Sequence, residues 1–121
     1  MNMNKQRFER QASNILSVLG NPFRIKIAFA LSEQEACVCH LEVLLKKRQA
    51  YISQHLMALR KAGLLQTRRD GKFVYYRLSE PGIINLIKDA AAIAGFNFEA
   101  IPELSTKQSL EKCICPHCGE K

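Results

Sequence analysis

Residues 48–63, with the sequence RQAYISQHLMALRKAG, decide the fold of this chain. Ile52, Leu56 and Leu59 recur at helical spacing, which predicts an amphipathic helix with one buried stripe. Gly63 follows Arg60, Lys61 and an alanine and stands where helices commonly end. The segment therefore predicts a short helix that packs against its domain by one face.

The opposite face of this helix is polar but almost uncharged. Its side chains can donate and accept hydrogen bonds: Gln49, Tyr51, Ser53, Gln54 and His55. A solvated helix is more often rich in Glu and Lys, and neither residue type occurs here before Lys61. Short polar groups at the front of a helix suit the reading of base edges in a DNA major groove. We expect these residues to contact bases, and we call this segment the reading helix.

A basic hairpin is predicted directly after the reading helix. Residues 64–69 and 72–78 form two short extended patterns around Asp70-Gly71. A helix followed by such a hairpin is typical of a winged helix-turn-helix, whose wing contacts phosphates. The phosphate candidates are Arg68, Arg69 and Lys72 in the wing, Arg24 in an earlier helix, and Lys47 in the turn before the reading helix.

Four more helices are predicted from apolar periodicity: Phe8 to Leu19, Pro22 to about Leu31, Cys37 or Val38 to about Lys46, and Pro81 to Ala94. Asn21 is expected to cap the second of these helices, and Ser79 or Glu80 the last. The predicted fold class is mainly α with a small β-hairpin wing. The last helix is apolar over more than one face, which predicts a homodimer built with the first helix.

The length and the net charge of the chain favour a nucleic-acid partner. With 121 residues the chain suits one core, and its formal charge of +7 favours a polyanion over an acidic-substrate pocket. Double-stranded DNA fits a helix and wing better than RNA does. We expect a DNA-binding and dimerisation domain over residues 1–95 and a cysteine-containing tail over residues 96–121. No apolar run approaches the roughly 20 residues that cross a bilayer, so a cytoplasmic protein without membrane contact is expected.

The five cysteines indicate metal or redox chemistry. An odd number in a cytoplasmic protein argues against structural disulfides. Thiolates select soft or borderline ions such as As(III), Cd(II), Pb(II) or Zn(II). The candidate ligands are Cys37, Cys39, Cys113, Cys115 and Cys118.

The spacing of Cys37 and Cys39 restricts how they can act together. Residues two apart on an ideal helix point about 200° apart, so a regular helix cannot present both to one ion. Either Cys37 lies before the first turn, or the ion distorts that turn. The tail cysteines then either complete this site, bind a separate ion, or bind nothing.

Two other functions would use the same cysteines. Cysteine oxidation or persulfide formation would switch the same repressor fold without a metal. The stretch from Cys115 to Cys118 also has the form of a thiol-disulfide oxidoreductase site. That chemistry needs a βαβ unit around it, which is not predicted here, so we expect no enzyme.

Four blocks of sequence, in order, resemble the ArsR/SmtB family of metal-responsive repressors: Leu19–Arg24, Cys37–Leu41, Ile52–Leu64 and Arg69–Leu78. The resemblance covers about residues 8 to 95. It implies a homodimeric winged-helix repressor that holds an operator until an inducer binds.

The Cys-Val-Cys block is similar to the thiolate site of the arsenic and cadmium/lead sensors of that family. The resemblance thus implies Cys37 and Cys39 as ligands. The third cysteine of the arsenic sensors falls on Glu42, and the N-terminal cysteines of the cadmium sensors have no counterpart in residues 1–20. The missing ligands would then come from the tail.

Overall fold

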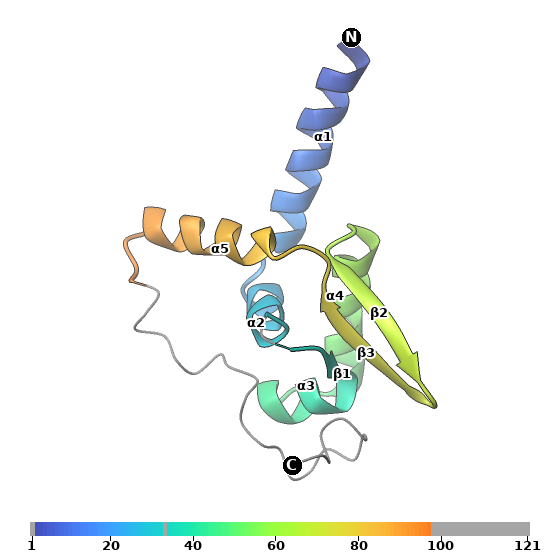
Figure 1. Cartoon of the computed structure of the whole chain (residues 1–121). Coiled ribbons are helices and arrows are strands. Elements are labelled where there is room, and N and C mark those ends of the chain that lie inside the picture. The colour runs from blue at the N-terminus through green and yellow to red at the C-terminus, as the bar shows by residue number, and fades with distance from the viewer. Residues whose placement is uncertain (1, 33, 98–121) are drawn as a thin grey trace.

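The computed structural model describes residues 2–32 and 34–97. Its helices are α1 (Asn2–Leu19), α2 (Pro22–Ala30), α3 (Val38–Leu45), α4 (Gln49–Lys61) and α5 (Gly82–Ile93). Its strands are β1 (Ala36–Cys37), β2 (Leu65–Asp70) and β3 (Phe73–Leu78). In Figure 1 the β2–β3 hairpin and α1 both project from a body formed by the other helices. The predicted winged helix-turn-helix class is confirmed.

The wing contains one more strand than the sequence predicts. The strand order is β1-β3-β2, with antiparallel pairing throughout. Strand β1 has two residues, and Cys37 pairs with Tyr75 of β3. A strand this short has no alternating pattern, so the sequence predicts only the hairpin.

Local interactions explain the turn before α2 and the turn after α4. The Asn21 side chain accepts hydrogen bonds from the backbone N–H groups of Phe23 and Arg24, at 2.9 and 3.2 Å, which confirms it as the cap of α2. Gly63 adopts φ +81° after α4, and the N–H of Leu64 donates to the Leu59 carbonyl. This left-handed termination favours glycine and turns the chain into the wing.

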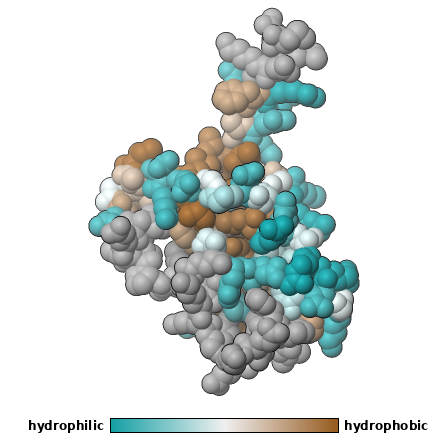
Figure 2. All heavy atoms as spheres, in the orientation of Figure 1, coloured by the Kyte–Doolittle hydropathy of each residue, from teal (hydrophilic) through white to brown (hydrophobic). Residues whose placement is uncertain are grey.

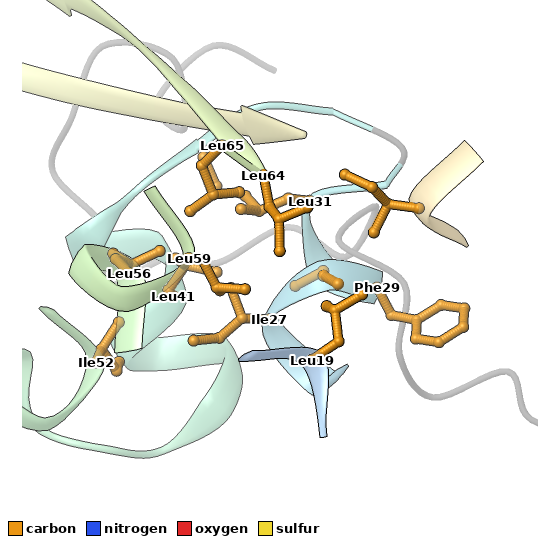
Figure 3. Close-up of a cluster of buried hydrophobic side chains, with 14 of the residues drawn as sticks. Leu19, Ile27, Phe29, Leu31, Leu41, Ile52, Leu56, Leu59, Leu64 and Leu65 are labelled. Atoms are coloured by element: carbon orange, nitrogen blue, oxygen red, sulfur yellow. The ribbon is translucent and has the colours of Figure 1, made fainter. Parts of the chain in front are cut away.

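One apolar core holds α4 against the other helices. The stripe predicted from the sequence is its centre, with Ile52, Leu56 and Leu59 each at most 1% exposed (Figure 3). Ile27 of α2 and Leu41 of α3 are fully buried beside them. Burying side chains of this size contributes about 1.5–3 kcal/mol each. The core therefore fixes the direction in which the remaining faces of α4 point.

Two helix ends differ from the prediction. Helix α1 begins at Asn2, whereas apolar periodicity marks it only from Phe8. Helix α5 has Pro81 at its N-cap position, with no side-chain hydrogen bond to the cap. The Ser79 hydroxyl instead donates to the Gly63 carbonyl at 2.7 Å, because the chain end of β3 lies beside the turn after α4. Ser79 thus ties the wing to the reading helix rather than capping α5.

Among the described residues, no helix is both long and apolar enough to cross a membrane.

Candidate nucleic-acid interface and cysteine site

The outer face of α4 carries most of the predicted base-edge residues. Gln49, Tyr51 and Gln54 are exposed, and Ser53 is half-buried. Met57, which the sequence analysis did not select, lies on this face and is 60% exposed. A shallow hollow of about 360 Å³ lies between five residues of the face: Ser53, Gln54, Met57, Ala58 and Lys61. The surface combines hydrogen-bonding groups with one apolar side chain, as base-edge recognition requires.

His55 is almost buried rather than on that outer face, and its expected contact with a base edge stays a prediction. It is 9% exposed, because its position on α4 is beside the buried stripe. Its ring packs against Phe23 and Tyr51, with ring centroids 5.3 and 4.8 Å away. Burial, and then the nearby Arg24 charge, lower the pKa of His55 below its ordinary value. A neutral ring keeps Nδ1 available as a hydrogen-bond acceptor.

Arg24 donates a hydrogen bond to that acceptor. Its Nε donates to His55 Nδ1 at 3.0 Å, and another guanidinium nitrogen donates to the Val18 carbonyl at 3.1 Å. The side chain therefore links α1, α2 and α4. Because a guanidinium has five donors, phosphate contact by Arg24 remains a prediction for its other N–H groups.

The cations around α4 lie at both of its flanks. The Lys47 ammonium is 5.5 Å from the centroid of the Tyr51 ring, before the first turn of the helix. Lys47 is exposed, and so are Arg69 and Lys72 in the wing. Phosphate contact by these three exposed side chains remains a prediction.

Arg68 differs from its neighbour Arg69 because it already has an internal partner. Its Nε lies 3.2 Å from both carboxylate oxygens of Glu35, with which it forms an ion pair. The Arg68 side chain is 49% exposed and that of Glu35 is 21% exposed. The hydrogen bonds that Arg68 donates to Glu35 raise the pKa of Arg68. Because a guanidinium has five donors, phosphate contact by Arg68 remains a prediction for the N–H groups that Glu35 does not bind.

The structure brings Cys37 and Cys39 together. Cys37 is the last residue of β1 and the N-cap of α3, with extended φ and ψ of −86° and 169°. It lies before the first helical turn, the first of the two arrangements the sequence left open. As a result the two Sγ atoms are 2.8 Å apart instead of on opposite sides of a helix. Cys37 is 2% exposed and Cys39 is half-buried. We call these two residues the cysteine pair.

The cysteine pair offers two sulfur atoms, which is fewer than the four ligands of a closed metal site. Within residues 2–32 and 34–97, no group of three or more His, Cys, Asp or Glu side chains is placed to hold a metal. Sulfur donors of this kind would fit a thiophilic ion, which would need further ligands from elsewhere. Cys113, Cys115 and Cys118 lie outside the described residues.

An apolar groove separates α5 from α1 and α2. Its volume is about 520 Å³, and its lining includes Leu16, Phe29, Leu86, Ala90 and Phe96. Leu16 and Phe96 are 57% and 64% exposed. Figure 2 shows hydrophobic residues gathered where these helices meet, whereas hydrophilic residues dominate the side that carries the wing. An apolar surface of this kind marks an interaction site on a folded monomer.

Comparison with known proteins identifies the fold with a family. The model of the bacterial regulatory protein arsR family matches residues 21–67. The biofilm growth-associated repressor of Agrobacterium fabrum is 39% identical over 88 residues, which cover 70% of this chain and 75% of the relative. The chain belongs to the ArsR family. This confirms the resemblance at the family level, and it confirms the expected regulator rather than an enzyme.

Other ArsR-family relatives align over a smaller share of their length. The transcriptional repressor SmtB homolog of Synechocystis is 35% identical over 82 residues, covering 68% of this chain and 62% of the relative. The arsenical resistance operon repressor of Escherichia coli is 46% identical over 66 residues, covering 54% of this chain and 56% of the relative. The chain thus spans about three-fifths of the length of these two repressors.

Solved structures of bacterial proteins superpose on this chain. Reduced HlyU from Vibrio cholerae has a TM-score of 0.65 and 28% identity, covering 77% of this chain and 98% of that one. The homodimeric winged helix-turn-helix DNA-binding domain of Mb0332 from Mycobacterium bovis has a TM-score of 0.67 and 26% identity, covering 74% and 83%.

Proposed function

We propose that this ArsR-family chain is a homodimeric transcriptional repressor that leaves its operator when a thiophilic metal or metalloid ion binds its cysteines. The observation that carries the proposal is the position of the cysteine pair. It lies at the start of α3, which is connected to α4 by a short turn, so an ion bound there acts next to the proposed reading helix. The place of action is the cytoplasm, where the DNA is.

DNA recognition would divide between the two sides of the reading helix. Gln49, Tyr51, Ser53 and Gln54 would contact base edges from the outer face of α4. The phosphate contacts would come from Lys47 before the helix and from Arg68, Arg69 and Lys72 in the wing. The net charge of +7 supports this division, because phosphate contacts supply affinity and base contacts supply specificity.

The second subunit would cover the apolar groove. Its lining comes from α1, α2 and α5, and Ile93 near the end of α5 is 89% exposed. Phe8 on α1 is 69% exposed, on a helix that projects from the body (Figure 1). Two copies related by a twofold axis would bury these surfaces and present two reading helices to a palindromic operator.

The inducer site would begin with the cysteine pair. Two thiolates that held one ion would lie farther apart than these sulfurs, which are 2.8 Å apart, so binding would open the contact. Cys113, Cys115 and Cys118 are the proposed sources of further sulfur ligands. As(III), Cd(II), Pb(II) and Zn(II) are the candidate ions.

One observation favours a second candidate function, a thiol-based redox switch. The 2.8 Å contact between the sulfurs is already close to the roughly 2.05 Å of a disulfide. An oxidant such as hydrogen peroxide would take two electrons and two protons from the thiols and become water. Oxidation would close the pair, whereas an ion would open it.

A single set of measurements separates these functions. Operator binding by the full chain would be followed by fluorescence anisotropy with Cd(II), with As(III), with peroxide and with a persulfide donor. We expect an ion to weaken binding, with Cys39→Ser keeping operator affinity but losing the response. A chain ending after Glu111 should bind the ion more weakly and show fewer sulfur ligands by X-ray absorption. A response to oxidant alone would replace the metal proposal with the redox one, and unchanged coordination after truncation would remove the tail from the site.

A further inference from the structure

One row of side chains crosses the sheet from the cysteine pair to the wing. The register pairs Cys37 with Tyr75 and Tyr75 with Arg68, so the three residues are neighbours across β1, β3 and β2. Residues directly opposite each other in a ladder share one face of the sheet. Tyr75 is 1% exposed and packs with Cys37, Cys39 and Phe73. The Arg68 guanidinium lies 4.7 Å from the centroid of the Tyr75 ring.

The same segment that carries Cys37 also holds Arg68 from its other side. Glu35, the ion-pair partner of Arg68, lies two residues before Cys37. Arg68 is thus fixed by a ring packed on Cys37 and by a carboxylate next to β1. Arg69 has neither contact: it pairs with Val74, on the opposite face of the sheet.

We propose that Arg68 transmits the chemical state of the cysteine pair to the DNA, and that Tyr75 is the positioning residue between them. The proposal rests on the proposed function of the cysteine pair. It names the wing, rather than α4 alone, as the part of the repressor that the inducer moves.

The mechanism follows from how tightly Cys37 is enclosed. An ion bound to the pair would replace the two thiol protons, and its two thiolates would lie farther apart than the 2.8 Å that separates the sulfurs here. Both cysteines pack in the Tyr75 cluster and Cys37 is 2% exposed, so separating their sulfurs would press on the ring or on β1. Either displacement changes the cation–π contact and the Glu35 ion pair that together fix Arg68. The guanidinium then leaves the position from which it contacts a phosphate.

The NMR signals of the arginine Nε–H groups in the full chain test, without DNA, whether Cys37 is coupled to Arg68 through Tyr75. Spectra would be recorded with and without Cd(II), with signals assigned from Arg68→Lys and Arg69→Lys. We expect Cd(II) to shift the Arg68 signal and to leave the Arg69 signal in place. Cys37→Ser should abolish the shift and Tyr75→Leu should reduce it, whereas Tyr75→Phe, which keeps the ring, should retain it.

A second comparison needs no metal. Cys37→Ala should by itself shift the Arg68 signal more than the Arg69 signal, because it alters the packing of Tyr75. If Cd(II) does not bind the wild-type chain, the proposed metal function is wrong. Cys37→Ala still shows whether a change at Cys37 reaches Arg68 through Tyr75. Equal shifts of both arginines, in the Cd(II) titration or in Cys37→Ala, would overturn the proposal. An undiminished Cd(II) shift of Arg68 in Tyr75→Leu would overturn it as well.

Discussion

Arg24 Nε donates a 3.0 Å hydrogen bond to His55 Nδ1, which joins α2 to the buried side of the reading helix. The bond requires a neutral imidazole, because a protonated ring has no acceptor. It also places a permanent charge beside a buried ring. The contact therefore makes the attachment of α4 sensitive to pH.

The first prediction is that stability falls with pH through His55. Burial and Arg24 lower the pKa of His55 in the folded chain, so the unfolded chain takes up the proton more readily. The stabilising effect is complete above the unfolded pKa of about 6.5 and is lost as the pH falls toward the folded value. Urea midpoints measured from about pH 7.5 to about pH 5.5 should show this loss in the wild type. His55→Asn, which keeps an acceptor but does not titrate, should show less of it, and an identical slope would contradict the assignment.

The second prediction concerns the cap of α2. Asn21→Ala removes the acceptor for two backbone N–H groups and should cost about 1 kcal/mol of unfolding free energy. Asn21→Ser is the matched control, because serine also caps helices and should recover most of the loss. Urea unfolding followed by circular dichroism measures both. Equal losses in the two variants would show that the cap hydrogen bonds are not the cause.

The third prediction separates base contacts from phosphate contacts. Gln54→Ala should cost about 1–3 kcal/mol at one operator position and little on random DNA. Lys72→Ala should weaken all sequences alike and reduce the salt slope by about one. Anisotropy titrations on operator and random duplexes at several salt concentrations distinguish the two patterns. If Gln54→Ala and Ser53→Ala leave both affinities unchanged, α4 is not the reading helix.

The fourth prediction concerns the dimer. Ile93 is 89% exposed, so Ile93→Glu should produce a folded monomer that binds the operator weakly. Ile93 follows the groove residues Leu86 and Ala90 at helical spacing, whereas the exposed Ala92 follows Lys88 and Asp89 and supplies the control Ala92→Glu. Ile87 is 6% exposed, so Ile87→Glu should unfold the subunit itself. Sedimentation velocity and circular dichroism separate these outcomes, and a stable dimer of Ile93→Glu would exclude this interface.

The parts of the fold predictable from sequence are those set by local chemistry. The Asn21 cap, the left-handed Gly63 and the apolar stripe of α4 depend on neighbours a few residues away, and each was found. His55 was placed on the wrong side because its angle on the helix lies at the border of the stripe, where only packing against Phe23 and Arg24 decides burial.

The contact between Cys37 and Cys39, and the row of side chains from Cys37 through Tyr75 to Arg68, were less predictable. Helical geometry restricted Cys37 and Cys39 to two arrangements, and β1 selects between them. That strand exists through pairing with residues almost 40 positions later in the chain, which no local pattern encodes. The contact of Arg68 with Tyr75 and with Glu35 depends on the same long-range register.

The shortness of β1 also determines how fast a reagent reaches Cys37. The side chain is 2% exposed, so the sulfur meets solvent only while the strand is open. Opening breaks a pairing of two residues rather than the whole domain, and such local opening costs far less than global unfolding. We therefore expect the alkylation rate of Cys37 to report the opening equilibrium of one short strand rather than the unfolding of the domain.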